Sequence, residues 1–273
     1  MKRSNTLSIC MIVRDEAALL PASLSDAAQL ADELIVVDTG SRDGSKAIAR
    51  RYTEKVYDFS WRDDFAAARN VSFSYASGDM VMWLDADDRI DPSQRAALRA
   101  FLADCSARLV LAGYERPENG GVFLYPRIVR RDSGFYWEGI VHEHLTLASG
   151  APPLAEGEVV TCDAVIRHAK PSPPNYARNI ALMARVPEAE FRRSFWLCAQ
   201  CYLDCILAGE RTQARHYLAL AEQSETPFPE RIQDYALINR VLKFHQKREA
   251  MLWWNALYLR DKKRYLAAQS SSL

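Results

Sequence analysis

The chain has 273 residues, 49% of them hydrophobic, which is enough to bury the core of a catalytic domain and of a smaller second region. Lys plus Arg and Asp plus Glu number 35 each, so no excess of positive charge supports nucleic-acid binding, and we expect no nucleic-acid partner. No apolar run approaches the roughly 20 residues needed to span a bilayer, so we expect any membrane contact to be peripheral.

The first half of the chain alternates strand-like and helix-like segments. The strand-like runs are 7–13, 33–38, 55–59 and 80–84, and the helix-like runs are 16–30, 44–52, 64–76 and 92–104. Such alternation, with short turn-rich connections, predicts an α/β fold with a mostly parallel sheet covered by helices on both faces. The run 7–13 leads at once into charged residues, so we interpret it as a buried strand and not as a signal peptide.

From residue 108 the pattern changes to strands without long helices. Strands are predicted at 109–114, 122–129 and 159–167, with an intervening segment at 135–147. We interpret them as an antiparallel or mixed extension of the sheet, with a hairpin turn at Gly120 and Gly121.

A proline-rich segment, 170–175, predicts a domain boundary between a catalytic domain at 1–170 and a second region at 176–273. The helices expected in the second region are 176–186, 189–208, 211–224, 228–245 and 248–268. Trp196, Tyr202 and Tyr217 fit one tetratricopeptide repeat, so this region is predicted to be all-α and tetratricopeptide-like.

The six cysteines do not form a disulfide framework. Cys198, Cys201 and Cys205 share one face of a predicted helix among apolar neighbours, and we interpret them as core packing. This usage predicts a reducing, cytoplasmic location.

Two carboxylates, Asp85 and Asp87, follow the apolar run 80–84 with one residue between them. Because side chains alternate along extended backbone, both can face one cation. Magnesium and manganese prefer carboxylate oxygens and commonly bridge to phosphate. Asp38 ends another predicted strand, and ligands of open α/β sheets bind beyond the carboxyl ends of the strands, so the three acids are expected to share a crevice.

The sequence resembles the family 2 glycosyltransferases of the GT-A fold over roughly residues 6–170. Four ordered motifs carry the resemblance: Leu7–Glu16 (LSICMIVRDE), Val36–Ser45 (VVDTGSRDGS), Ala68–Asn70 (ARN) and Gly78–Asp88 (GDMVMWLDADD). The later motifs Tyr136–Glu143 (YWEGIVHE) and Val165–His168 (VIRH) are similar to a bacterial subgroup that carries tetratricopeptide-like helices after the catalytic domain. That subgroup includes enzymes of cell-surface polysaccharide assembly and peptide S-glycosyltransferases.

The resemblance implies a nucleotide-sugar donor, with a uridine nucleotide favoured, and Mn²⁺ or Mg²⁺ as cofactor. The residues expected to bind the nucleotide sugar are Ile12, Val13, Arg14, Glu16, Asp38, Arg69 and Asp85. The residues expected to hold the metal are Asp85, Asp87 and His168. A divalent ion there would stabilise the charge of the departing nucleoside diphosphate.

An inverting displacement, usual for this family, requires a general base for the acceptor proton. The candidates are Glu143, His142 and Asp88, and we prefer Glu143. On a strand, His142 and His144 would share one face and Glu143 would lie on the other. Asp88 departs from the commoner Glu after the Asp-x-Asp, which leaves its role open.

The sequence thus predicts a metal-dependent, inverting transferase that moves a sugar from a UDP-sugar donor to a bacterial glycan, lipopolysaccharide, capsule, lipid-linked saccharide or peptide acceptor. Two alternatives remain: a sugar-phosphate nucleotidyltransferase, and an inactive module that recruits a partner. The first usually has a Gly-rich N-terminal loop, which Val13–Glu16 lacks. The sugar, the acceptor, the linkage and the oligomeric state stay open.

Overall fold

The computed structural model describes residues 4–116, 121–169 and 175–270. These residues form two compact units, the first ending at residue 169 and the second starting at residue 175. Gly120 of the predicted hairpin turn and residues 170–174 of the predicted domain boundary lie outside the described residues.

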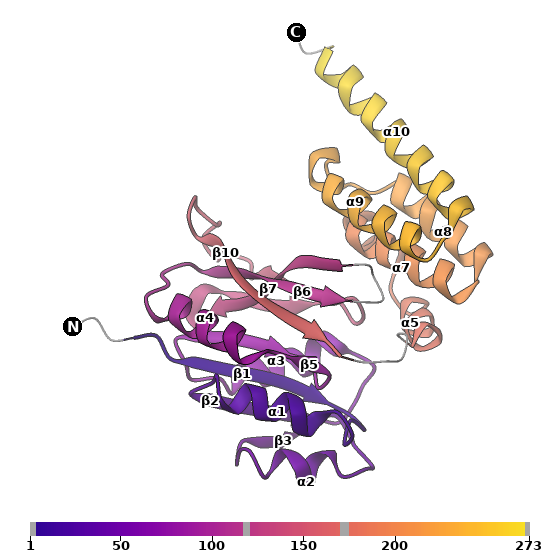
Figure 1. The fold of residues 1–273 in the computed structure, drawn as a ribbon. Coiled ribbons are helices and arrows are strands. Elements are labelled where there is room, and N and C mark those ends of the chain that lie inside the picture. Colours follow the sequence, from indigo (N-terminus) through magenta and orange to yellow (C-terminus); the bar gives the residue numbers. More distant parts are fainter. Residues whose placement is uncertain (1–3, 117–120, 170–174, 271–273) are drawn as a thin grey trace. The chain divides into compact units, whose positions relative to one another are not determined.

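The first unit is built on an eight-stranded sheet with the order β3-β2-β1-β4-β7-β6-β10-β5 (Figure 1). The strands are β1 (Leu7–Val13), β2 (Glu33–Asp38), β3 (Val56–Asp58), β4 (Met80–Leu84), β5 (Asp88–Arg89), β6 (Leu109–Arg116), β7 (Gly121–Arg130) and β10 (Val159–His168). Strands β3, β2, β1 and β4 are parallel, β7 runs antiparallel to β4 and β6, β10 is parallel to β6, and β5 is antiparallel to β10. The mixed extension predicted from the later strands is therefore confirmed.

Helices cover both faces of this sheet, and the alternation of side chains along β1 shows how. Leu7, Ile9 and Met11 point into one core together with residues of α1 (Leu20–Ala28), α2 (Ser45–Ala49) and α4 (Pro92–Ala103). Cys10 points to the other face, which α3 (Phe65–Ser74) and a small antiparallel sheet of β8 (Phe135–Glu138) and β9 (His144–Leu147) cover. The predicted α/β fold with helices on both faces is confirmed.

The first helix begins later than predicted, because the residues before it join the neighbouring loop. Helix α1 starts at Leu20 and not at Glu16. The backbone N–H of Glu16 donates to the Ser45 hydroxyl (2.8 Å), and Asp15 adopts a left-handed φ of 52°. Residues 14–17 are thereby tied to the start of α2 instead of entering a helix.

The second unit is all helical. Its helices are α5 (Tyr176–Met183), α6 (Glu188–Arg193), α7 (Phe195–Ala208), α8 (Arg211–Glu222), α9 (Phe228–Phe244) and α10 (Arg248–Ser270). The single helix predicted at 189–208 is wrong, because Ser194 is extended (φ −128°, ψ 101°) and divides it. The Ser194 hydroxyl accepts the N–H of Leu197 (3.1 Å), so this residue caps α7.

An aromatic cluster forms the core of the second unit. Tyr202 and Trp254 are fully buried and stacked, with ring centroids 5.1 Å apart, and Tyr235 packs against Trp254 at the same distance. Cys198 and Cys201 are also fully buried, in keeping with their interpretation as core residues.

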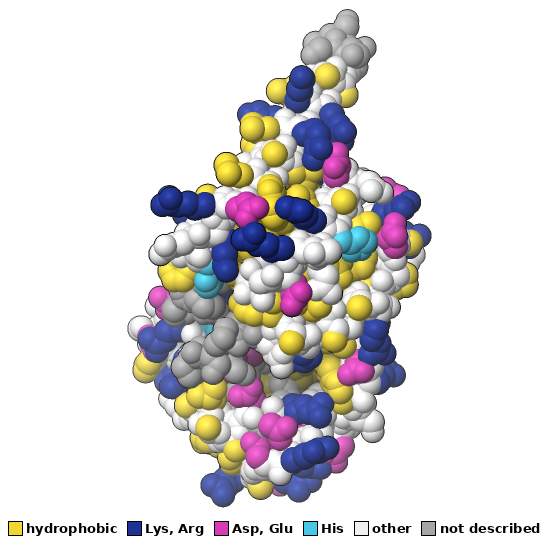
Figure 2. All heavy atoms as spheres, turned by 90° about the vertical axis from the view of Figure 1, so that its right-hand side faces the viewer, with side chains coloured by type: hydrophobic (Ala, Val, Ile, Leu, Met, Phe, Trp, Pro, Cys, Tyr) yellow, Lys and Arg dark blue, Asp and Glu magenta, His cyan; other side chains and the backbone are white. Residues whose placement is uncertain are grey.

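The surface carries charges of both signs. On the face seen in Figure 2, Lys and Arg side chains are interspersed with Asp and Glu, and hydrophobic side chains lie among them. Within the described part of the chain, no helix is long and apolar enough to cross a membrane.

Candidate metal and nucleotide site

The carboxyl ends of three neighbouring parallel strands meet at one edge of the sheet. In the register of the sheet Val13 of β1 lies beside Asp38 of β2, and Met11 of β1 lies beside Leu84 of β4. Asp38 is the last residue of β2 and Asp85 follows β4 directly, so the structure brings these acids to the same edge, as the strand-end argument predicts.

The loop after β1 is joined to the loop after β2 by hydrogen bonds that backbone N–H groups donate. The N–H of Thr39 donates to the carbonyl of Val13 (2.9 Å), and the N–H of Arg42 donates to the carboxylate of Asp15 (2.7 Å). The predicted nucleotide-binding segment Ile12–Glu16 therefore runs beside the turn that follows Asp38.

Asp38 has one satisfied and one unsatisfied carboxylate oxygen. Its Oδ1 accepts the N–H groups of Gly40 (3.0 Å) and Ser41 (2.9 Å), which fixes the turn after β2. Its Oδ2 is buried and has no hydrogen-bond partner among the residues that the structure describes. An unpaired buried acceptor costs about 1–3 kcal/mol, so a ligand that donates an N–H or O–H there would recover that energy.

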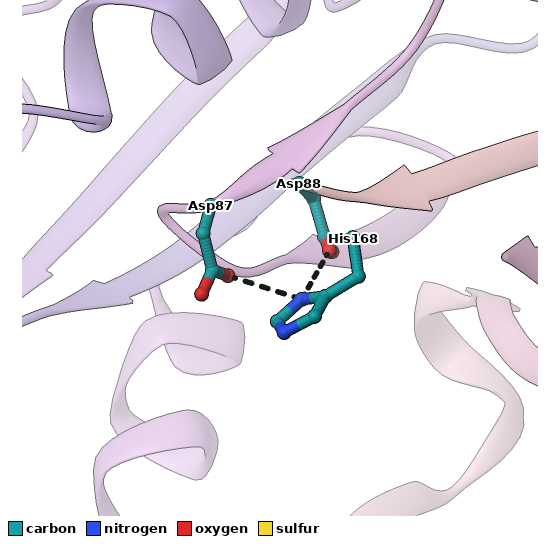
Figure 3. A group of neighbouring side chains, drawn as sticks. All are labelled: Asp87, Asp88 and His168. Atoms are coloured by element: carbon teal, nitrogen blue, oxygen red, sulfur yellow. Dashed lines mark ion pairs between the residues drawn. The ribbon is translucent and has the colours of Figure 1, made fainter. Parts of the chain in front are cut away.

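Three possible metal ligands, Asp87, Asp88 and His168, converge between β5 and the end of β10 (Figure 3). One ligand atom of each lies within 4.8 Å of the others, and His168 Nδ1 lies 3.5 Å from Asp87 Oδ1. The antiparallel pairing of His168 with Asp88 brings together residues 80 positions apart, and the N–H of Ala169 donates to the carbonyl of Asp87 (2.9 Å).

Asp88 is buried, and both of its carboxylate oxygens accept hydrogen bonds from other residues of the protein. Its Oδ2 accepts the N–H of Asp85 (3.0 Å) and Arg127 Nη1 (3.0 Å), and its Oδ1 accepts the hydroxyl of Tyr114 (2.8 Å). Burial raises the pKa of Asp88, but the charge of Arg127 and the hydrogen bonds to His168, Asp85 and Tyr114 outweigh it and hold the pKa below its usual range. Arg127 is itself fully buried, with its guanidinium 3.6 Å from the Trp83 ring centroid. Asp88 thus closes the turn that carries Asp85 and Asp87.

His168 is half-buried and lies beside Tyr114 and Asp88. Its Nδ1 lies 3.0 Å from the hydroxyl of Tyr114, whose own partner is Asp88. Burial lowers the pKa of His168, while the hydrogen bond with Asp88 and the charge of Asp87 raise it above its usual value. A carboxylate and an imidazole presented together in this way suit Mn²⁺ or Mg²⁺, the former more because it accepts nitrogen ligands readily.

Asp85 turns toward a different partner. Arg69 Nη2 donates to Asp85 Oδ1 (2.9 Å), and Arg69 Nε donates to Glu143 Oε1 (2.7 Å). Burial lowers the pKa of Arg69, but the charges of Asp85 and Glu143 outweigh it and raise that pKa above its usual value, so the guanidinium stays charged. Glu143, our preferred base, is therefore joined to the Asp-x-Asp through Arg69.

The loop that carries Glu143 is not the strand that the sequence pattern predicts. Residues 139–143 connect β8 to β9, and His142 has a left-handed φ of 54°. Because β9 begins only at His144, the expectation that His142 and Glu143 occupy opposite faces of a strand is wrong.

Sequence reasoning missed one residue of the site, Tyr114, because it lies inside β6, where no local pattern distinguishes it from a core position. It considered Arg127 and Asn70 near the donor phosphates, whereas in the structure Arg127 is buried against Asp88 and Asn70 bonds the backbone of Trp137. The Asn70 side chain donates to the Trp137 carbonyl and accepts the Trp137 N–H, both at 2.8 Å, so it anchors β8 to α3.

Comparison with known proteins gives a family match over more than half of the chain. The family model described as glycosyl transferase family 2 matches residues 8–149. A TPR repeat-containing protein of Synechococcus elongatus is 42% identical over 124 residues, 45% of this chain and 30% of that protein. The lipopolysaccharide core biosynthesis glycosyltransferase LpsC of Rhizobium meliloti is 29% identical over 157 residues, 50% of this chain and 57% of that protein. The alignments thus span from under a third to just over half the length of these curated relatives.

Among solved structures, glucosyl-3-phosphoglycerate synthase from Mycobacterium tuberculosis in complex with Mn²⁺ and UDP-glucose is 19% identical, with a TM-score of 0.48 over 66% of this chain and 77% of that one. The structure of TarS residues 1–349 from S. aureus is 16% identical, with a TM-score of 0.48 over 96% of this chain and 92% of that one. At this level of similarity neither carries an argument about function.

Proposed function

From the premise that the chain belongs to glycosyl transferase family 2 and is a glycosyltransferase, we propose that it is a metal-dependent, inverting enzyme that uses a UDP-sugar. The acceptor in this proposal is a bacterial glycan, lipopolysaccharide, capsule, lipid-linked saccharide or peptide, and the reaction takes place in the cytoplasm. The family match favours sugar transfer over the nucleotidyltransferase and the inactive-module alternatives.

The observation that carries the metal proposal is the convergence of Asp87 and His168 beside Asp88 at the carboxyl edge of the sheet. We assign Asp87 and His168 as the direct ligands, with Asp85 offering the carboxylate oxygen Oδ2 that Arg69 leaves unused. Asp88 keeps its hydrogen bonds to Asp85 and Tyr114 and orients the ligands without contacting the metal, as residues surrounding the ligands of metal sites do. A divalent cation supplies positive charge for the diphosphate that leaves with the broken glycosidic bond.

Asp38 and the loop after β1 are proposed to bind the nucleoside. The buried, unpartnered Oδ2 of Asp38 is an acceptor for an N–H donor, which uracil has at its imide nitrogen. The segment Ile12–Glu16 runs beside this turn, so its backbone is available to the base and the ribose. The unpartnered oxygen of Asp38 and the adjacent backbone of Ile12–Glu16 are the features of this chain that support a uridine nucleotide.

Glu143 is proposed as the general base. As the acceptor oxygen attacks the anomeric carbon, its proton passes to the Glu143 carboxylate, and the bond from that carbon to the phosphate oxygen breaks, releasing UDP. Glu143 keeps one oxygen, Oε2, without a hydrogen-bond partner among the described residues, whereas both oxygens of Asp88 accept hydrogen bonds. That difference makes Glu143 the better acceptor of a proton.

The second unit is proposed to engage the acceptor. Tyr202, Tyr217 and Trp254 are buried and belong to its core, while Trp253 is partly exposed and lies under the guanidinium of Arg215 (4.7 Å to the ring centroid). The LpsC relative, named for lipopolysaccharide core biosynthesis, supports a saccharide acceptor.

A screen of nucleotide sugars tests the proposal. The protein is incubated with Mn²⁺ and, separately, UDP-, GDP- and ADP-sugars, and the released nucleoside diphosphate is measured with and without excess EDTA. We expect slow hydrolysis of one or more UDP-sugars that EDTA abolishes. Hydrolysis of a GDP-sugar in preference would overturn the choice of base, and undiminished hydrolysis in EDTA would overturn the metal.

A further inference from the structure

Arg69 is held on all sides by groups of the site. Its side chain is only 8% exposed, and its guanidinium donates to Asp85 (2.9 Å) and to Glu143 (2.7 Å). The same guanidinium lies 4.6 Å from the ring centroid of Trp83 and 4.9 Å from that of Trp137. Such an arrangement fixes both the position and the orientation of the planar group.

Two separate motifs of the sequence meet at this residue. Arg69 and Asn70 are neighbours on α3, and both contact the segment that starts with β8: Asn70 through two hydrogen bonds to the backbone of Trp137, Arg69 through the Trp137 ring and the Glu143 carboxylate. A fourth hydrogen bond joins the same parts, from the N–H of Phe65 to the carbonyl of Ile140 (3.1 Å). Helix α3 thus fixes both ends of the connection that carries Glu143.

We propose that Arg69 is a positioning residue, which holds the base Glu143 and the Asp-x-Asp carboxylate Asp85 in fixed relation to each other, and not a ligand of the donor phosphates. This inference rests on the proposed function, in which Glu143 takes the acceptor proton and Asp85 faces the cation. Arg69 acts through these two carboxylates.

The geometry argues against direct binding of the donor. To reach a phosphate with the nitrogens it now uses, the guanidinium would have to release Asp85 or Glu143, and Glu143, with 13% of its side chain exposed, would then be a poorly hydrated carboxylate without its counter-ion. Bound as it is, Arg69 uses one oxygen of each acid and leaves Oε2 of Glu143 and Oδ2 of Asp85 for the acceptor proton and the cation.

The test compares three variants of the full chain. Arg69→Met keeps the methylene packing between the two indole rings but removes the charge, and Arg69→Lys restores a charge that can satisfy only one carboxylate well. Arg108→Met is the matched control, since Arg108 is similarly buried (10% of its side chain exposed) and pairs with Glu158 and with the carbonyls of Pro152 and Ser133.

Two activity readouts separate positioning from donor binding. With UDP-glucose and UDP-N-acetylglucosamine as probes, Arg69→Met should lower the kcat of hydrolysis by about a hundredfold, the scale of a misplaced catalytic group, and Arg69→Lys should recover part of it. The Kd of UDP with Mn²⁺, measured by calorimetry, should change by less than about threefold, and Arg69→Met should slow Glu143→Gln by a smaller factor than it slows the wild type. A tenfold weaker Kd for UDP at unchanged kcat would instead assign Arg69 to the donor phosphates.

A third readout needs neither donor nor activity. Hydrogen exchange of the backbone amides in residues 138–143 should become faster in Arg69→Met, while exchange in β1 and the Tm stay close to those of wild type or of Arg108→Met. Unchanged exchange in residues 138–143 would overturn the positioning role. Wild-type protein that neither binds UDP nor hydrolyses either probe would contradict the proposed function, and the exchange result would still decide whether Arg69 orders the Glu143 loop.

Discussion

The two units differ in how their buried charged side chains are arranged. In the first unit Asp87, Asp88 and His168 converge at the ends of strands that are distant in sequence, and Asp85 and Glu143 each keep one carboxylate oxygen that no described residue binds. The second unit contains a buried ion pair inside its helical core: Arg231 binds Asp261 at 2.7 Å, and the Tyr235 hydroxyl donates to the same carboxylate at 2.7 Å.

This difference distinguishes the candidate reactive site of the first unit from the structural ion pair of the second. Among the described residues, the cluster of Asp87, Asp88 and His168 is the one group of three His, Cys, Asp or Glu side chains close enough to hold a metal, and it lies in the first unit. In the second unit the buried carboxylate of Asp261 is neutralised by Arg231, so this pair has a structural role. We therefore place the chemistry in the first unit.

The largest effect is expected for Asp87→Ala. Removing a group that positions charge against the leaving diphosphate should lower UDP-sugar hydrolysis by about two to three orders of magnitude. Asp261→Asn is the matched control, because Asp261 is as buried as Asp87 (6% and 7% exposed) but lies in the second unit. It should lower the Tm and leave hydrolysis unchanged. Comparable losses of hydrolysis in both variants would remove the division between the units.

Trp254→Ala should act on stability alone. The ring is fully buried against Tyr202 and Tyr235, and truncation of such a residue costs about 3–5 kcal/mol of unfolding free energy. Thermal unfolding followed by circular dichroism measures this loss. Below the unfolding transition, hydrolysis of the UDP-sugar should match wild type, and a fall in kcat of a fully folded variant would show that the second unit takes part in the chemistry.

Asp38→Ala should weaken UDP binding by about 1–3 kcal/mol, the loss of one buried hydrogen bond. Asp38→Asn is the sharper comparison, because an amide oxygen can still accept from Gly40 and Ser41 while the unpartnered Oδ2 becomes a donor. Calorimetry in the presence of Mn²⁺ should show both variants weakened. If Asp38→Asn binds UDP as tightly as wild type, Oδ2 does not accept a proton from the base.

Glu33 is a structural acid inside the first unit, and we expect its replacement to change stability only modestly. Burial raises its pKa, but hydrogen bonds from Lys55, Ser77 and Ser8 outweigh this and lower the pKa to about 2. Because the folded pKa lies below the unfolded value, Glu33 stabilises the fold above about pH 4.5, and that contribution, on the order of 1–3 kcal/mol, is lost as the pH falls toward 2.

Urea unfolding of wild type and Glu33→Gln measures this term. Their stabilities should differ most at neutral pH and converge toward pH 2, with equal hydrolysis of the UDP-sugar at neutral pH. A difference that does not depend on pH would contradict the assignment to this carboxylate.

The parts of the site that were predictable depend on local pattern. The apolar run before Asp85 marks a strand end, and ligands of such sheets bind beyond strand ends, so the pattern predicts a site at this edge. Residues 86 and 87 form a turn, so the expected alternation of side chains does not apply to Asp85 and Asp87. His168 was found through a motif, and the pairing of β10 with β5 brings it to Asp88. These residues could be proposed from short segments because each segment carries its own signal.

The parts that were not predictable depend on contacts between distant segments. Arg69 and Glu143 are 74 positions apart, and nothing near either residue indicates that they form an ion pair. Asp88 resembles its neighbours in sequence, yet Arg127 and Tyr114 from two other strands bury it and make it structural. At Ser194 a hydroxyl that caps the next helix interrupts a sequence that is otherwise helical in pattern.

The central claim is that Asp87 and its neighbours hold a divalent cation that recruits a nucleoside diphosphate. The most direct measurement is a calorimetric titration of UDP into wild type and Asp87→Asn, each with Mn²⁺ and with excess EDTA. The account predicts binding to wild type that requires Mn²⁺ and is lost in Asp87→Asn under both conditions. Equal affinity of wild type for UDP with Mn²⁺ and with EDTA, unchanged in Asp87→Asn, would contradict it.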